Sequence, residues 1–380
     1  MSENADLSVK RGISFAKDEE QAVRELYDEI YQPDAEVVIF FCSSRYDPDK
    51  LGNSIKGRFP CALMGCSTAG EITSGGYHEG SIVGVSLASR ALRAHIRPVA
   101  PLSRFSAEKA EAMAGSIREE LVFSSAFDRN RMFGLLLIDG LSMLEEQTTS
   151  FIHSQFEGVS IVGGSSGDDL RFEATRIYAD GRFIPDAAVF ALFETTLPFH
   201  IFKTQHFQPT DLKLVITEAD PANRRVLEIN GEPAAQEYAE MLGMNIDELS
   251  PMVFSNHPLM LSIGGEYYVR SIQKVNEDGS LSFFCAIDNG LVLTVADGIG
   301  LAENLQNQLL EIRRHIPNPK LMLGCDCILR RLEIQEKGLI NDVCEAIKDS
   351  NLIGFSTYGE QFNAIHVNQT LTGVAIGDPE

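Results

Sequence analysis

Short apolar runs alternate with amphipathic stretches along the chain, and the same order of segments occurs three times. Each time an apolar run typical of a buried strand is followed by a helical stretch, a second apolar run, a turn of small residues and a third strand-like segment. The first runs are Val37–Phe41, Phe133–Ile138 and Leu321–Leu323. The third segments are Ser81–Leu87, Ala187–Phe193 and Thr370–Ile376. A unit that recurs after about one hundred residues is too long for a solenoid and indicates duplicated domain parts.

The turn is the most regular part of this repeat. Its three copies read Gly65-Cys66-Ser67-Thr68-Ala69-Gly70-Glu71, Gly163-Gly164-Ser165-Ser166-Gly167-Asp168-Asp169 and Gly354-Phe355-Ser356-Thr357-Tyr358-Gly359-Glu360. A turn of this kind after a buried strand can offer backbone N–H groups and hydroxyls to a small polar or anionic ligand. Glycine and serine are equally what a tight turn needs for structural reasons alone, glycine for a positive φ and serine for local hydrogen bonds. If the turns bind a ligand, the candidate residues are Ser67, Ser165, Ser166, Ser356 and Thr357.

The mixture of strands and helices predicts an α/β or α+β layered fold, with mixed sheets and flanking helices. Capping residues and stop signals predict the helices 48–58, 106–121, 146–156, 232–242, 297–315 and 332–348. Residues 217–225, which include Asp220-Pro221, form a turn after which the pattern begins again. Since a chain of 380 residues is long enough for two domains, we expect domains at residues 1–215 and 216–380. A fainter fourth copy of the turn lies at 261–266.

Composition and charge exclude several classes of partner. The formal net charge is −22, which argues against nucleic acid and against an anionic membrane surface. The N-terminus has no apolar stretch of a secretion signal, so we expect a cytoplasmic protein. Seven scattered cysteines are typical of reduced thiols, and Cys325-x-Cys327 has no second ligand pair at zinc-site spacing. A thiol redox switch through these two cysteines is an open alternative.

The second turn also reads Gly163-x-Ser165-x-Gly167, the pattern of a hydrolase nucleophile elbow. That motif must lie between a strand and a helix, but here the residues from Asp168 to Arg176 read as a loop that enters a strand. The other two copies also break the pattern. We therefore expect no enzymatic activity, with a Ser165 hydrolase as the alternative.

One strand-like segment contains two of the eight histidines. Period-two alternation places His200, Phe202, Thr204 and His206 on one face. Several aromatic residues and the cations Arg171, Arg176, Arg182 and Lys203 are near in sequence. An apolar aromatic wall, an imidazole and a few cations are what a non-covalent haem site requires. The alternative is a core strand with one hydrogen-bonded histidine.

Four segments of the chain resemble the FIST domain proteins, which carry consecutive FIST N and FIST C regions. They are the turns 65–71 and 354–360, the segment 226–243 and the ending His366-Val-Asn-Gln-Thr370. The resemblance implies an intracellular sensory module. The stretch Asp186–Thr210 is similar to a subgroup of bacterial haem-binding nitric oxide sensors.

The subgroup resemblance implies haem b, with His206 as the iron ligand and His200 as the other candidate. Phe202, Arg176, Arg182 and Lys203 would then surround the cofactor. It also implies a partner histidine kinase or other signalling protein, with output through a phosphorelay or cyclic-di-GMP, and a homodimer is one alternative for the oligomeric state. The alternative is a haem-free sensor that binds a small polar ligand, such as an amino acid, at the Gly/Ser turns.

Overall fold

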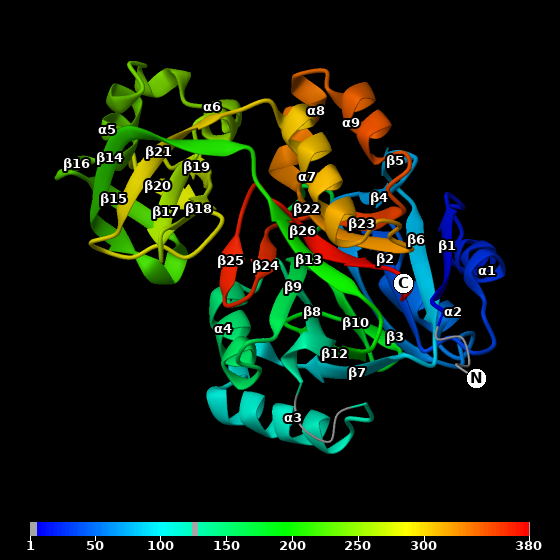
Figure 1. Ribbon diagram of the computed structural model, residues 1–380. Coiled ribbons are helices and arrows are strands. Elements are labelled where there is room, and N and C mark those ends of the chain that lie inside the picture. Colours follow the sequence, from blue (N-terminus) through cyan, green and yellow to red (C-terminus); the bar gives the residue numbers. More distant parts are fainter. Residues whose placement is uncertain (1–5, 124–127, 380) are drawn as a thin grey trace.

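The computed structural model describes residues 6–123 and 128–379, whose strands form three mixed sheets and one antiparallel sheet (Figure 1). Three of these sheets have six strands each and make up what we call the three-sheet body. The fourth sheet belongs to residues 207–298, which we call the inserted domain; Figure 1 shows it in green and yellow beside the body. The expected α+β architecture with flanking helices is confirmed.

The body consists of three units that share one order of elements. The first contains β1 (Ser8–Ser14), α1 (Glu19–Ile30), β2 (Val37–Ser43), α2 (Pro48–Ile55), β3 (Ala62–Thr68), β4 (Glu71–Thr73), β5 (Gly76–His78) and β6 (Ile82–Ala88). The second contains β7 (Leu92–Val99), α3 (Ala107–Glu119), β8 (Met132–Ile138), α4 (Glu145–Gln155), β9 (Ser160–Ser165), β10 (Ile177–Ala179), β11 (Arg182–Ile184) and β12 (Ala188–Thr195).

The third unit is interrupted by the inserted domain. It contains β13 (Phe199–Thr204), α7 (Leu301–His315), β22 (Leu321–Cys327), α8 (Ile328–Glu336), α9 (Ile340–Ile347), β23 (Leu352–Thr357), β24 (Glu360–Phe362), β25 (Ile365–Val367) and β26 (Leu371–Ile376). The inserted domain contains β14 (Phe207–Asp220), β15 (Arg225–Ile229), β16 (Glu232–Pro233), α5 (Ala234–Met241), α6 (Pro251–Asn256), β17 (Leu259–Ile263), β18 (Glu266–Arg270), β19 (Ile272–Val275), β20 (Leu281–Phe283) and β21 (Val292–Gly298).

Each unit donates the hairpin that follows its small-residue turn to the sheet of another unit. The hairpin β4–β5 pairs with β23, β10–β11 pairs with β3, and β24–β25 pairs with β9. The three sheets therefore have equivalent strand orders: β1-β6-β2-β3-β10-β11, β7-β12-β8-β9-β24-β25 and β13-β26-β22-β23-β4-β5. Because the exchange runs from the first unit to the third, from the third to the second and from the second to the first, the body is a closed ring with pseudo-threefold symmetry.

The inner faces of the three sheets share one core. Phe41 of the first unit stacks on Phe355 of the third at 4.4 Å between ring centroids, and Phe133 stacks on Phe193 at 4.8 Å. These four rings are fully buried, and burial of one such side chain contributes about 1.5–3 kcal/mol. The helices cover the outer faces, with separate apolar clusters under α1 and α2, under α3 and α4, and under α7 and α9. The units therefore fold around each other, because none closes its core alone.

The first glycine of each turn lies where two parallel strands approach closely. A Cβ atom would lie 2.5 Å from the Phe40 carbonyl oxygen at Gly65, 1.9 Å from that of Leu136 at Gly163, and 1.9 Å from that of Gly324 at Gly354. None of these three glycines has a positive φ; the later turn glycines Gly70 and Gly359 do. Close approach thus explains the first glycine of each turn, and positive φ explains the later glycine in the first and third turns.

The structure differs from the sequence predictions in several places. The expected boundary between residues 215 and 216 falls inside β14, and the exchanged hairpins place strands of both halves in one sheet. The helix predicted over 332–348 is two helices, because Gly338 adopts a φ of 66° between them. The helix predicted over 232–242 begins after the short strand β16, and that predicted over 297–315 begins at Leu301. The fourth turn copy is the hairpin β17–β18 of the inserted domain.

In the described residues, no helix combines the length and the apolar character that crossing a bilayer requires.

We predict that Gly163→Ala lowers the free energy of unfolding by about 1–3 kcal/mol, because the new methyl group overpacks the contact with the Leu136 carbonyl. Urea unfolding followed by circular dichroism measures this change. Gly115→Ala is the matched control. It lies inside α3 with open space around it, and should stabilise the chain by about 0.5–1 kcal/mol. Equal effects of the two substitutions would contradict the close-approach explanation.

Candidate functional site

The three small-residue turns meet in the centre of the body and close a ring of backbone hydrogen bonds. In each bond, the N–H of one turn donates to the carbonyl of the next: Ala69 to Ser356 at 3.0 Å, Tyr358 to Ser165 at 3.2 Å, and Gly167 to Ser67 at 3.0 Å. Three similar bonds run in the opposite sense: Ser356 to the Gly70 carbonyl, Ser165 to Gly359, and Ser67 to Arg176. The sequence repeat is therefore a spatial cluster.

Two of the turns end in a buried glutamate that fixes the donated hairpin. The Glu360 carboxyl accepts hydrogen bonds from the Thr370 N–H and hydroxyl and from the Thr357 hydroxyl. Glu71 has the equivalent contacts with Ser81 and Thr68. Burial raises the pKa of Glu71 to about 7 and that of Glu360 to about 8, although the hydrogen bonds oppose this shift. These carboxyls hold protons near neutral pH and have a structural role.

The second unit departs from this pattern. Its register places Ile177 where the other turns have glutamate, and residues 168–175 are inserted before the hairpin. We call residues 168–175 the inserted loop. Asp168 organises it: the carboxylate accepts from the N–H groups of Phe172 (2.9 Å), Glu173 (2.7 Å) and Ala174 (2.8 Å), and from the Tyr358 hydroxyl. Burial disfavours the charged form, but these hydrogen bonds outweigh it and hold the pKa of Asp168 below its ordinary value.

The inserted loop contains left-handed residues other than glycine. Asp169, Leu170 and Phe172 have φ angles of 57°, 62° and 54°. Left-handed backbone costs on the order of 1–3 kcal/mol per such residue, and it is least favourable for bulky side chains. The four hydrogen bonds to Asp168 offset this strain. Strain of this kind is concentrated at functional sites, which makes the loop a candidate element of one.

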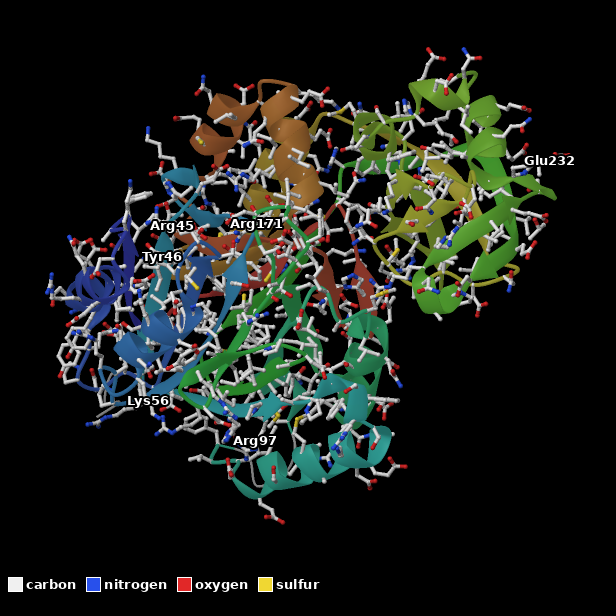
Figure 2. The ribbon with its side chains drawn as sticks, turned by 180° about the vertical axis from the view of Figure 1, so that it is seen from behind. Arg45, Tyr46, Lys56, Arg97, Arg171 and Glu232 are labelled. Carbon is white, nitrogen blue, oxygen red and sulfur yellow. The ribbon has the colours of Figure 1, made fainter. Side chains whose placement is uncertain are left out.

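The loop forms one wall of a cavity of about 220 Å³, which we call the arginine pocket. The cavity lies at the carboxyl ends of the parallel strands β2 and β3, where ligands of open α/β sheets commonly bind. Arg171 and Arg176 line it together with serine hydroxyls, two carboxylates and an apolar wall. Its other lining residues are Cys42, Ser43, Ser44, Tyr46, Pro48, Leu51, Ser67, Asp168, Glu173, Ala174 and Phe183. Figure 2 shows Arg171 near Arg45 and Tyr46.

The two arginines of this pocket have no acidic partner within residues 6–123 and 128–379. Arg171 donates to the hydroxyl of Ser44 at 2.6 Å and to the carbonyls of Ser44 and Asp168. Arg176 donates to the Thr175 carbonyl at 2.8 Å. In a chain with a net charge of −22, two guanidinium groups without a carboxylate partner are candidates for binding an anion, in a cavity that Asp168 and Glu173 also line.

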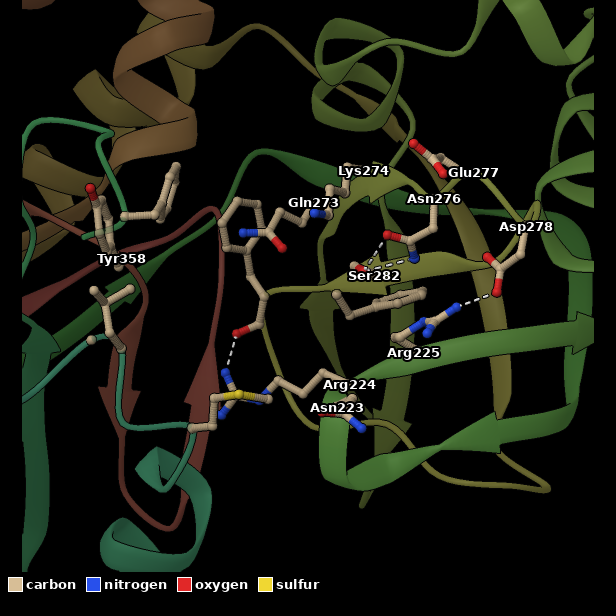
Figure 3. Close-up of a pocket in the computed structure, with 16 residues that line it drawn as sticks. Asn223, Arg224, Arg225, Gln273, Lys274, Asn276, Glu277, Asp278, Ser282 and Tyr358 are labelled. Atoms are coloured by element: carbon tan, nitrogen blue, oxygen red, sulfur yellow. Dashed lines mark hydrogen bonds and ion pairs between the residues drawn. The ribbon is translucent and has the colours of Figure 1, made fainter. Parts of the chain in front are cut away.

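A second cavity of about 800 Å³ separates the body from the inserted domain, and we call it the interdomain cleft (Figure 3). Leu141, Met143, Phe172 and Tyr358 line it from the body. From the inserted domain come Asn223, Arg224, Arg225, Gln273, Lys274, Asn276, Glu277, Asp278, Ser282, Phe283 and Phe284. Arg224 binds Glu145 at 2.6 Å and Glu146 at 2.7 Å, and this buried ion pair joins the two parts beside the cleft.

Comparison with known proteins gives the family. The FIST N domain model matches residues 36–232 and the FIST C domain model matches residues 234–363. This chain belongs to the FIST family. FIST domains are sensory domains of signalling proteins, so the family resemblance and the expected signalling role are confirmed at that level.

Two further comparisons add less. An uncharacterised protein of Methanocaldococcus jannaschii is 26% identical over 251 residues, which cover 57% of this chain and 48% of that protein. The chain thus spans about half the length of this curated relative. The match to a solved structure, PurLQS from Thermotoga maritima, covers 99% of this chain and 73% of that chain at 10% sequence identity. Its TM-score of 0.21 is too low to show a shared fold.

His206, the first candidate for a haem ligand, is fully buried at the junction of β13 and β14. Its Nε2 lies 2.8 Å from the Glu333 carboxylate, and its Nδ1 lies 3.1 Å from the Arg330 guanidinium. Burial lowers the pKa of the imidazole. Because both ring nitrogens have protein partners, the residues as placed here do not fit an axial iron ligand at His206. Haem ligation stays a prediction that requires another arrangement of these residues.

The other residues predicted around a haem lie apart. His200 is half-buried and stacks on His315 at 4.0 Å between ring centroids. Phe202 packs under α7, and the Lys203 ammonium lies over the Tyr268 ring at 4.3 Å. Arg176 belongs to the arginine pocket, and Arg182 is exposed on β11 of another sheet.

The serine turns come together, but most of their hydroxyls are buried. All five predicted ligand-binding residues are buried, and Ser67 is the one among them that lines the arginine pocket. The Ser165 hydroxyl accepts from Gln361 at 3.0 Å. Burial raises the pKa of the Cys325 and Cys327 thiols well above the ordinary value.

Sequence reasoning did not assign Asp168 to a ligand site, and it named Arg171 as one of the cations near the histidine strand, not as part of a site with Ser44. Alignment of the three turns contains the signal, since only the second copy has additional residues between the turn and the hairpin. The sequence does not show that the hairpins are exchanged between units. This exchange pairs β10 with β3 of the first unit and so places Arg176 next to that strand.

We predict that the free energy of unfolding falls as pH rises from about 5 to about 9, partly because of Glu360. Its folded pKa of about 8 exceeds the ordinary value of 4.5, so the stabilisation is complete below pH 4.5 and is lost as pH rises through 8. Glu360→Gln replaces the carboxyl by a neutral group that does not ionise. At pH 9 this variant should therefore be more stable than the unmodified chain, by at least about 1.4 kcal/mol, the equivalent of one pKa unit. Exposed Glu232→Gln is the control, and parallel pH profiles for all three chains would refute this assignment.

We predict that His206→Ala destabilises the chain by about 1–3 kcal/mol, since it removes the buried partner of Glu333 and one buried partner of Arg330, which keeps its ion pair with Asp326. His200→Ala, at a half-exposed position, should change stability by less than about 0.5 kcal/mol. Thermal unfolding of both variants, with and without haemin, measures the difference. If His206→Ala is as stable as the unmodified chain and also loses a haem absorption band, His206 is an iron ligand and the structural role is wrong.

Proposed function

We propose that this FIST chain is a sensory module that binds a short dicarboxylate, an acidic amino acid such as L-glutamate, in the arginine pocket. The observation that carries this proposal is the pair Arg171 and Arg176, which line one cavity and have no acidic partner among the described residues. Guanidinium groups bind carboxylates through charge-assisted hydrogen bonds, often two at a time.

The rest of the pocket supports the same class of ligand. Its volume of about 220 Å³ is below the 300–1,000 Å³ typical of sites for drug-sized molecules, so a small metabolite is the matching size. Leu51, Pro48 and Phe183 give an apolar wall for a short methylene chain. The exposed carboxylate of Glu173 is available to an ammonium group, which favours an amino acid over a simple diacid.

In this proposal the chain has no enzymatic activity and acts on a partner signalling protein, for which a histidine kinase is the expected class. Haem and nitric oxide sensing is the other function implied by the sequence resemblance. The geometry supports it less, because His206 is held by Glu333 and Arg330 while the arginine pocket is open.

We predict that L-glutamate or L-aspartate raises the melting temperature of the chain, because a ligand that binds only the folded state stabilises it by an amount that grows with the logarithm of its concentration relative to its Kd. Thermal unfolding with the twenty amino acids and succinate identifies the ligand, and calorimetric titration gives its Kd. Arg176→Gln and Arg171→Gln should each weaken binding at least about tenfold, because each removes a charge-assisted contact worth about 1.5–3 kcal/mol.

Arg182→Gln is the matched control, since this arginine lies on the same hairpin as Arg176 but does not line the pocket. It should leave the affinity unchanged. The proposal fails if no acidic amino acid or succinate binds, or if Arg182→Gln weakens binding as much as Arg176→Gln.

A further inference from the structure

The inserted loop lines both the arginine pocket and the interdomain cleft. Arg171, Glu173 and Ala174 face the pocket, while Phe172 lies in the cleft. The loop therefore places neighbouring residues of the chain in two separate cavities.

Phe172 joins the body to the inserted domain. Its ring stacks on Tyr358 at 4.7 Å between centroids and lies 6.2 Å from Phe284 of the inserted domain. Phe172 is 38% exposed to solvent, and its backbone has a left-handed conformation. Backbone strain of this kind persists only while the surroundings hold it, so a change in that support is expected to shift Phe172.

That support depends on Asp168 and on Arg171. The Asp168 carboxylate fixes the backbone of the loop at Phe172, Glu173 and Ala174, and the Tyr358 hydroxyl that it binds belongs to the ring on which Phe172 stacks. Arg171 ties the same loop to Ser44 beside β2. A carboxylate in the pocket competes with the neutral Ser44 oxygens for the Arg171 guanidinium and forms the stronger, charge-assisted bond.

We propose that the inserted loop couples occupancy of the arginine pocket to the interdomain cleft, so that the position of the inserted domain is the output of the sensor. The ligand draws Arg171 from Ser44, and Phe172, its neighbour in the chain, shifts against Tyr358 and Phe284. This inference rests on the proposed function, because the ligand is the acidic amino acid proposed to bind in the arginine pocket. A ligand shifts such an equilibrium by its differential affinity for the two states, and the coupling is reciprocal.

Because the coupling is reciprocal, a change in the interdomain cleft should alter the affinity of the arginine pocket for its ligand. Phe172→Ala does not touch the arginine pocket, but it should change the Kd for L-glutamate by at least about fivefold, the lower end of common coupling. Met143→Ala is the control: Met143 lines the same cleft and is exposed, but it lies outside the loop. It should change the Kd by less than about twofold, as expected for a site without coupling. Calorimetric titration of the full chain measures both.

A spectroscopic readout follows the cleft itself. The chain has no tryptophan, so Phe284→Trp introduces a single reporter in the cleft, and Phe105→Trp introduces one against α3, away from the cleft. Saturating L-glutamate should shift the emission of the Phe284→Trp chain and leave that of the Phe105→Trp chain unchanged. Adding Phe172→Ala to the Phe284→Trp chain should abolish the shift.

The outcomes separate the two proposals. If L-glutamate binds but neither Phe172→Ala nor the cleft reporter responds, the coupling is wrong and the proposed function stands. If L-glutamate does not bind, acrylamide quenching of Phe284→Trp in the Arg171→Ala background tests the loop without a ligand. A change there that Arg182→Ala does not produce supports the coupling, and no change overturns it.

Discussion

The structure depends on the exchange of hairpins among three units. The backbone hydrogen bonds that join the small-residue turns close this exchange into a ring, and each bond links two different units. Since every six-stranded sheet takes its last two strands from another unit, no unit has a complete sheet without the others. The buried glutamates Glu71 and Glu360 reinforce the ring where two of the hairpins begin. Duplication therefore produced one interlocked body.

Much of this fold can be predicted from the sequence, because the repeat consists of apolar runs and turns of small residues. The strand runs, the turns and most helices follow from spacing and capping, which are local properties. The exchange does not follow, because a three-residue hairpin strand contains no information about which sheet edge it joins. The inserted domain is hidden for a similar reason: β13 and α7 are neighbours in space, and residues 207–298 lie between them in the chain.

The candidate site arises where the symmetry is broken. In the first and third units the turn leads directly to a buried glutamate, whereas the second has the inserted loop and Ile177 instead. In the second unit a strained loop therefore stands where the other units have a buried glutamate, and this loop places Arg171 beside Arg176 in the arginine pocket. The histidine pattern of residues 200–206 also fits a structural role, since His206, which follows β13, joins a buried polar network with α8 at the entrance to the inserted domain. Alternation along a strand shows which residues share a face and not what faces them.

Arg171 and Arg176 are proposed to bind the carboxylates of one small ligand. A crystal structure of the full chain grown with L-glutamate tests it most directly. We expect electron density for the ligand in the arginine pocket, with its two carboxylates on the two guanidinium groups. Density for L-glutamate in the interdomain cleft with the arginine pocket empty, or no bound ligand at saturating concentration, would contradict it.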